Sequence, residues 1–460
     1  MSTKTYRPYV PEQMFLMPLA LQEWLPPEHL VYFVSDAVDA MDLSAILSVY
    51  EDETRGYPPY HPVMLTKILL YGYCIGVPSS RKIERRCEED IGFRVLAANN
   101  QPDFRTISDF RKRHLSALKE LFLQVLRMCQ KAGLVKLGHV ALDGTKVKAN
   151  ASKHKAMSYG RMQEKEPELE KEIEEFLRKA ESVDEEEDRK YGKDKRGDEL
   201  PEELAFRESR LKKIREAMAA LEEEARTRAE EKRQEIQSME SEGLKRGRKF
   251  PEPDPTPDPK TQRNFTDPDS RIMPVSGGKS FEQAYNCQAA VDNQEQVIVA
   301  CEVTQEPNDK KQLEAMIKKV QKNTKKKPGE LSADAGYWNA KRIEELGKGQ
   351  TGFFIPPNKQ RHNDKGLTAE RGRIPKHLSF ADKMRRKLRT KKGKAIYSKR
   401  KETVEPVFGQ IKQGRGFRQF LLRGVEKVRG EWSLICTTHN LLKLWRAQGP
   451  APPGRKWAFA

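Results

Sequence analysis

The stretch GHVALDGTKVKA, residues 138–149, marks the point at which the chain changes from helical to β-forming in character. Short runs of β-forming residues lie on both sides of Asp143-Gly144. An Asp-Gly pair between two such runs is the most common hairpin turn, so this motif by itself favours a turn. The alternative is a carboxylate at the end of a buried strand.

Further strands are predicted after residue 263, where they alternate with helices. The predicted elements are strands at QAYNCQAAVD (283–292) and QVIVACEVT (296–304), a helix at Asp309–Gln321, a strand at GELSADAG (329–336), a helix at Asn339–Leu346 and a strand at TGFFIPP (351–357). This order is typical of a mixed α/β sheet. A last helix, Val425–Trp445, is apolar enough to be buried.

Residues 1–135 are predicted to be mostly helical. The predicted helices are His29–Met41, Val63–Cys74, a basic helix at RKIERRCEED (81–90) and one long helix at Asp103–Gln130. A helix, a short break and a basic helix between residues 63 and 90 have the rhythm of a helix-turn-helix. An ordinary corner of a helical bundle has the same pattern, so both interpretations stay open.

Residues 161–262 read as an insert of a different kind. Two charged helices are predicted at Glu164–Ala180 and Leu204–Ile236, and apolar residues recur every seven positions from Leu204 to Ala225. This seam predicts an antiparallel helical hairpin, although a solvated charged helix without a partner would look similar. A linker follows at 243–262, where prolines alternate with other residues and favour an extended chain.

The charge of the 460-residue chain is unevenly distributed. The net charge is +18, yet residues 161–240 carry −8, so the rest of the chain carries +26. Residues 381–400 alone carry +9. Such positive charge favours a polyanionic partner, because neutralised phosphates release counterions. A basic protein with no such partner is the alternative.

Cysteine usage and hydropathy bear on where the protein acts. The six cysteines form no C-x-x-C pair, which argues for free thiols in a reducing compartment and against a zinc finger. The start, MSTKTYRPYVPEQ, has no apolar signal core. No run of about 18 apolar residues occurs, so no membrane span is expected. The histidines His139, His154 and His439 show no ligand spacing.

Three acidic residues stand in positions suited to metal binding. Asp143 and Asp334 each end a predicted strand, and Glu405 lies two helical turns before Lys412 on one face. Carboxylates are the ligands that Mg²⁺ prefers, and a pair of such ions can cleave phosphodiesters. Taken singly, Asp334 fits a strand-exit loop and Glu405 fits a surface ion-pair helix equally well.

The combined order of these motifs resembles the DDE transposases of bacterial insertion sequences. It runs D-G-T after a strand, D-A-G-Y after a later strand, and Y-x-x-R followed by E-x6-K. NFTDPDSRIM, YNCQAAVD, VEPVFGQIK and THNLLKLW are also similar to stretches of that family. Residues 15–130 resemble its N-terminal helical region, so only the 160–250 insert is left outside the resemblance.

The resemblance implies a ribonuclease-H-like core in which Asp143, Asp334 and Glu405 hold two Mg²⁺ ions, with Mn²⁺ as a substitute. Tyr397, Arg400 and Lys412 match family positions that contact DNA near the active site. One departure concerns spacing: the family leaves three residues between Arg and Glu, whereas four separate Arg400 from Glu405, and Lys401 has the expected spacing instead. The role of Arg400 is therefore open. Pro406 suggests a helix that begins near Thr403 or kinks there.

These observations predict an α/β protein in which a ribonuclease-H-like mixed sheet carries a helical insert and follows an all-α N-terminal domain. The predicted units are 1–135 (DNA-binding helices), 136–160 with 263–424 (catalytic), 161–262 (insert and linker) and 425–460 (C-terminal helix and tail). The predicted DNA contacts are Tyr397, Arg400, Lys401, Lys412, Arg81, Lys82, Arg85, Arg111 and Arg113.

The predicted function is metal-dependent cleavage at insertion-sequence ends and strand transfer into target DNA. We expect a homo-oligomer assembled on DNA, and a bacterial cytoplasmic location that is nucleoid-associated when DNA is bound. The alternatives are a catalytically silent DNA-binding protein derived from a transposase, and a plain metal-dependent nuclease.

Overall fold

The computed structural model describes most of the chain. The described residues are 20–51, 59–191, 202–241, 251–275, 280–347, 351–358, 372, 375, 377–449, 457 and 459. Residues 1–19, the first part of the linker (242–250) and 450–456 of the tail lie outside them. No described helix has the length and apolar character needed to cross a membrane. All six cysteines are buried free thiols.

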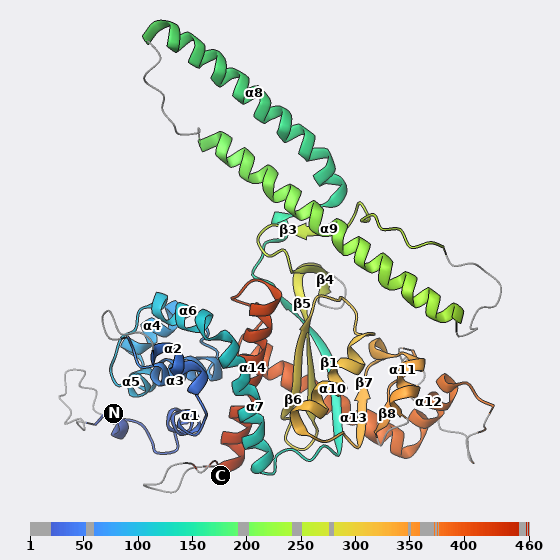
Figure 1. The fold of residues 1–460 in the computed structure, drawn as a ribbon. Helices are drawn as coiled ribbons and strands as arrows, with labels where there is room; N and C mark the ends of the chain where they lie inside the picture. The colour runs from blue at the N-terminus through green and yellow to red at the C-terminus, as the bar shows by residue number, and fades with distance from the viewer. Residues whose placement is uncertain are drawn as a thin grey trace, which may run out of the picture.

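A mixed sheet forms the centre of the molecule (Figure 1). Its middle strand, β1 (His139–Lys148), runs straight through Asp143-Gly144, so the hairpin-turn interpretation of that pair is wrong. β1 pairs antiparallel with β5 (Ser280–Asp292) and parallel with β7 (Glu330–Ala333). The apolar residues before Asp143 are fully buried, which explains why the chain stays extended there instead of turning.

The remaining strands extend this sheet on both sides. β6 (Ile298–Thr304) and β4 (Arg271–Val275) pair antiparallel with β5, and β8 (Gly352–Phe354) pairs parallel with β7. The predicted mixed α/β sheet is therefore confirmed. The helices that follow these strands are α10 (Gln312–Thr324), α11 (Ala340–Gly347), α12 (Phe380–Arg389) and α13 (Lys391–Gly409).

Helix α13 carries Glu405, and the expectation that this helix starts near Thr403 is wrong, while a kink there stays a prediction. It begins at Lys391 and continues past Pro406 to Gly409. A proline inside a helix leaves the carbonyl four residues earlier without its donor. Here that carbonyl belongs to Glu402, and the side chain of Gln296 supplies the missing donor at 2.9 Å from Nε2 to O. A side chain from the turn between β5 and β6 thus replaces the helical hydrogen bond that Pro406 cannot donate.

The N-terminal part is helical, as predicted. Its helices are α1 (Leu30–Asp39), α2 (Ser44–Glu51), α3 (Pro62–Cys74), α4 (Ser80–Glu89), α5 (Ile91–Leu96), α6 (Phe104–Arg113) and α7 (Leu115–Lys131). The single long helix expected at Asp103–Gln130 is wrong, because it is divided at His114 into α6 and α7. The buried imidazole of His114 lies 3.0 Å from the hydroxyl of Tyr50, a partner that fixes the break.

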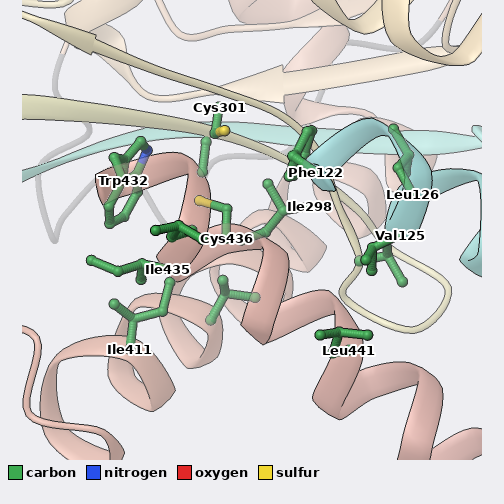
Figure 2. Packing of buried hydrophobic residues seen from close by; sticks show 14 of the residues in the cluster. Phe122, Val125, Leu126, Ile298, Cys301, Ile411, Trp432, Ile435, Cys436 and Leu441 are labelled. Atoms are coloured by element: carbon green, nitrogen blue, oxygen red, sulfur yellow. The ribbon is translucent and has the colours of Figure 1, made fainter. Parts of the chain in front are cut away.

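The last helix, α14 (Val425–Gln448), joins the N-terminal helices to the sheet. In Figure 2, its residues Trp432, Ile435, Cys436 and Leu441 lie in one packed cluster with Phe122, Val125 and Leu126 of α7 and with Ile298 and Cys301 of β6. The side chain of Asn440 donates to the Ile298 carbonyl at 2.9 Å and accepts from its N–H at 2.9 Å. Residues of α1 to α7, the sheet and α14 belong to one hydrophobic cluster. The division into units stays a prediction.

The insert forms two long helices that project from the sheet (Figure 1). They are α8 (Tyr159–Tyr191) and α9 (Glu202–Ser241), and a small two-stranded sheet of β2 (Ala156–Ser158) and β3 (Gln262–Asn264) lies at their base. Their apolar seam consists of Tyr159, Met162, Leu169, Leu211, Ile214, Ala217 and Leu221. The predicted seam is present from Leu211 onward, whereas the Leu204 side chain lies outside the described residues.

The buried imidazole of His439 on α14 makes the fold sensitive to acid. It bonds the Gln296 carbonyl at 3.0 Å, and burial lowers its pKa to about 3. Because the pKa is depressed by folding, the stabilisation is complete above the unfolded-state pKa and is lost as pH falls. The unfolding free energy of the wild type should fall between pH 7 and pH 4.5. We expect this fall to be about 2–3 kcal/mol smaller in His439→Gln, as measured by urea unfolding. His154→Gln, at an exposed histidine, should keep the wild-type pH slope.

Candidate active site

Two of the predicted acids are neighbours because of the register of β1 and β7. Leu142 pairs with Ala333 in the parallel ladder, and each is followed directly by an acid, Asp143 and Asp334. The two carboxylates therefore leave adjacent strands at the same level of the sheet. The two acids are far apart along the chain, but this does not affect their proximity. Adjacent parallel strands run in the same direction, so paired residues are followed by residues at the same edge.

Arg400 from α13 faces this pair of acids. Its Nη1 lies 2.8 Å from Oδ2 of Asp143, and both side chains are largely buried. The pKa of Asp143 is raised to about 6, mainly by burial; Arg400 and the Gly144 N–H act to lower it, and the charges of Asp334 and Asp309 act to raise it. The effect of burial on the Asp143 carboxyl therefore outweighs its ion pair with Arg400.

Glu405 is placed differently from the other two acids. It lies on the exposed side of α13, and its charge helps to raise the pKa of Arg400. Within the described part of the chain, no three Asp, Glu, His or Cys side chains are arranged so that they could hold a metal ion. The assignment of Asp143, Asp334 and Glu405 to one metal site therefore stays a prediction.

The surroundings of Arg400 and Lys401 show which of these two basic residues faces the acids. Arg400 is buried against Asp143 and lies 5.8 Å from the Tyr397 ring centroid, whereas Lys401 is exposed. The basic residue that faces the acids is thus Arg400, despite its longer distance in sequence from Glu405. Lys412 donates from Nζ to the carbonyl of Lys146 on β1 at 2.6 Å, which ties the end of the helix to the strand of Asp143.

A fourth acid, Asp309, lies at the same place and was missed in the sequence. It stands in the connection between β6 and α10, where a helix start had been predicted. Its Oδ1 accepts from Asn286 Nδ2 and Gln288 Nε2, both at 2.7 Å. Gln288 in turn accepts from the hydroxyl of Tyr337. The sequence does contain a signal for Asp309, since it is an acid that shortly follows a predicted strand. This signal was used only for Asp143 and Asp334.

Two glycines leave room for this arrangement. A Cβ added to Gly144 would lie 2.5 Å from Gln288 Nε2 and 2.9 Å from Asp309 Oδ1. A Cβ added to Gly336 would lie 2.9 Å from Asp334 Oδ1 and 3.5 Å from Asp309 Oδ2. Gly144 of D-G-T is therefore required by the close approach of Gln288 and Asp309, and Gly336 of D-A-G-Y by the close approach of the Asp334 carboxylate.

Comparisons with known families agree with this geometry. Residues 19–113 match the model of a transposase domain (DUF772), and residues 360–445 match a transposase DDE domain. Over these two segments the chain is similar to DDE transposases. The second match includes Glu405, while Asp143 and Asp334 lie outside both matches. No curated protein and no solved structure matches the chain.

The N-terminal residues predicted to contact DNA divide into two groups. Arg81, Lys82 and Arg85 are exposed on α4, and Arg113 is exposed at the end of α6. Arg111 contradicts its prediction, because it is buried and its Nη1 donates to the Pro78 carbonyl at 2.8 Å and to the hydroxyl of Tyr73. It holds α3 and α6 together and does not reach the surface.

A basic groove lies at the end of β1 that carries Lys148. It has a volume of about 390 Å³, and its cationic lining residues are Lys148, Lys155 and Arg423. Asp143 and Lys148 belong to the same strand, so at about 3.3 Å per residue the groove begins roughly 16 Å from the acids. A larger cavity of about 1270 Å³ is lined only by residues of the N-terminal helices.

The close packing at Gly144 can be tested by substitution. We expect Gly144→Ala to lower the unfolding free energy by about 1–3 kcal/mol, because the new methyl group displaces Gln288 and Asp309. Gly138→Ala is a matched control just before the same strand, where an added Cβ meets nothing within 4 Å. Urea unfolding of both variants measures the difference. Equal stability of the two would contradict the packing described at Gly144.

Proposed function

We propose that this transposase cleaves DNA at the ends of its element and joins the freed 3′ hydroxyl to target DNA, with Asp143, Asp334 and Glu405 as its catalytic acids. The single observation that carries the proposal is the pair of acids on adjacent strands beside Arg400. The mixed sheet and the family matches support a ribonuclease-H-like core as the frame of this site.

The donor set fits divalent cations such as Mg²⁺. Asp143 and Asp334 offer hard oxygen ligands, and a bound cation would offset the cost of holding the buried Asp143 carboxylate in its charged form beside Asp334. Asp143, Asp334 and Glu405 would hold the ions. When bound, two such ions activate the attacking oxygen and stabilise the leaving oxygen.

The chain's own basic residues take up the negative charge of the DNA. Arg400 neutralises Asp143 in the protein alone, and a guanidinium is also well suited to bind a phosphate through two parallel hydrogen bonds. We assign Arg400 to binding of the scissile phosphate. Lys401 and Lys412 on the same helix, with Lys148 and Arg423 in the basic groove, would position the neighbouring phosphates.

The proposal is tested with purified protein, its flanking genomic DNA and Mg²⁺. Asp143→Asn, Asp334→Asn and Glu405→Gln should each abolish cleavage while DNA binding is kept or tightened, since one repulsion against phosphate disappears. Cleavage is followed on a labelled duplex, and joining is followed with a pre-cleaved end. Cleavage without joined product would make the protein a plain nuclease, and neither activity would make it a silent DNA-binding protein.

Glu402→Gln is the matched control for the third acid. Glu402 is an exposed carboxylate on the same helix, and only its backbone carbonyl has a role in the fold, as the acceptor of Gln296. The variant should cleave at the wild-type rate. Loss of cleavage in Glu402→Gln together with activity in Glu405→Gln would transfer the role of third acid to Glu402.

The exposed basic face of α4 is expected to bind the DNA ends. The double variant Lys82→Ala with Arg85→Ala should lower the slope of log affinity against log salt by about 2, because two phosphate contacts are lost. The slope is measured by fluorescence anisotropy of the full chain at salt concentrations from about 50 to about 200 mM, the usual range for such titrations. Arg86→Ala on the same helix should change it less, since Arg86 already pairs with Asp90 at 3.3 Å. An unchanged slope in the double variant would transfer recognition to residues 381–423.

A further inference from the structure

We propose that Asp309 is a fourth acidic residue of the active site, and that its Oδ2 contributes to binding of the divalent cation beside Asp334. This inference rests on the proposed function, because it assigns a further residue to the same site. The resemblance assigns no role to Asp309, and the family matches, which cover residues 19–113 and 360–445, do not include it.

One oxygen of Asp309 is fixed by buried amides. Asn286 and Gln288 are both fully buried on β5, and each donates an amide N–H to Oδ1 at 2.7 Å. Asn286 also donates to the Glu306 carbonyl in the same connection at 3.1 Å. Two hydrogen bonds from rigid strand residues hold the carboxylate in one orientation, although it belongs to a loop.

The other oxygen of Asp309 faces the catalytic acids. Asp309 Oδ2 and Asp334 Oδ1 lie at 3.5 Å and 2.9 Å from the position where Gly336 would carry a Cβ. The two carboxylates thus lie around the same glycine. Within the described part of the chain, Oδ2 has no hydrogen-bond donor, in contrast to Oδ1.

The same network connects Asp309 to the strands of both acids. Gln288 pairs with Gly144 in the β1–β5 ladder, next to Asp143. Its side-chain oxygen accepts from Tyr337, which is fully buried and lies three residues after Asp334. Asp309 is therefore positioned relative to Asp143 and Asp334 by hydrogen bonds, and its position does not depend on the conformation of its own loop alone.

A purely structural role does not explain the charge of Asp309. The amides of Asn286 and Gln288 need only one acceptor oxygen, which an asparagine at this position would also provide. The second oxygen brings negative charge to a place where Asp143 and Asp334 already repel each other, and this repulsion costs stability in the absence of a cation. A bound cation would attract the Asp309 carboxylate, so the negative charge of this residue becomes favourable. An aspartate is therefore preferred at position 309 when a cation is bound.

The experiment compares Mn²⁺ binding by full-length wild type, Asp309→Asn and Glu306→Gln, followed by the water-proton relaxation of the bound ion. We expect Asp309→Asn to lower Mn²⁺ affinity by about tenfold, in the range found when residues around metal ligands are altered. Its urea stability in EDTA should be equal to or above that of wild type, because Oδ1 keeps its partners and one repulsion is gone. Glu306→Gln, which removes an exposed charge from the same connection, should bind Mn²⁺ like wild type.

A second variant separates the charge from the network. Tyr337→Phe removes the hydroxyl that Gln288 accepts but leaves every carboxylate in place. Wild-type affinity in Tyr337→Phe together with weak binding in Asp309→Asn supports direct participation of the Asp309 carboxylate. Wild-type affinity in Asp309→Asn, with binding lost in Asp334→Asn, overturns the role of Asp309 alone. Absence of Mn²⁺ binding in wild type overturns both this role and the proposed function.

Discussion

The pairing of β1 with β7 is the contact on which the rest of the site depends. It joins two segments that are far apart in the chain and sets Leu142 opposite Ala333, so that the acid after each emerges at the same level. A shift of the register by one residue would turn one of the two carboxylates to the other face of the sheet. The buried apolar residues before each acid prevent such a shift, because they would then face the wrong layer.

A surplus of negative charge is the second property of this centre. Asp143, Asp334 and Asp309 crowd one end of the β1–β7 pair, and a single guanidinium, from Arg400, faces them. Low exposure strengthens both the repulsion and the attraction, since the effective dielectric constant falls with burial. Cation binding is therefore electrostatically favoured beside these acids, at the position where the family resemblance expects cations. The exposed location of Glu405 leaves the helix side of the site more open than the strand side.

The shared core gives the N-terminal helices a direct mechanical link to the catalytic sheet. α14 packs on α7 with one face and on β6 with another, and Arg415, which follows α13, donates to the carbonyl of Tyr73 in α3 and to Thr438 in α14. DNA held by exposed residues of α4 would consequently be held in a fixed position relative to the acids. The α8–α9 hairpin has its own small apolar seam, and its net negative charge disfavours contact with phosphates.

The sequence by itself determined the elements whose evidence is local. Periodicity predicted the strands, the mixed sheet, the helical N-terminal part and the hairpin, because apolar spacing reports which face of an element is buried. Asp143 and Asp334 were assigned as acids of the site only through the combined order of the motifs and its resemblance to a known family, since each alone also fits a turn or a loop. Local signals misjudged Asp143-Gly144 as a turn and Pro406 as a helix start, and they gave no warning of the break at His114. Each of these depends on a distant partner: the neighbouring strands, the side chain of Gln296 and the hydroxyl of Tyr50.

Only the tertiary structure decided how residues from separate elements meet. It buried Arg111 between helices, turned Arg400 toward Asp143 while Lys401 stayed exposed, and placed Asp309 beside the acids through the amides of β5. Spacing along the chain could not reveal these contacts, because hydrogen bonds and ion pairs depend on distance in space. Asp143 within β1, Asp309 after β6 and Asp334 after β7 become neighbours only after the sheet has formed.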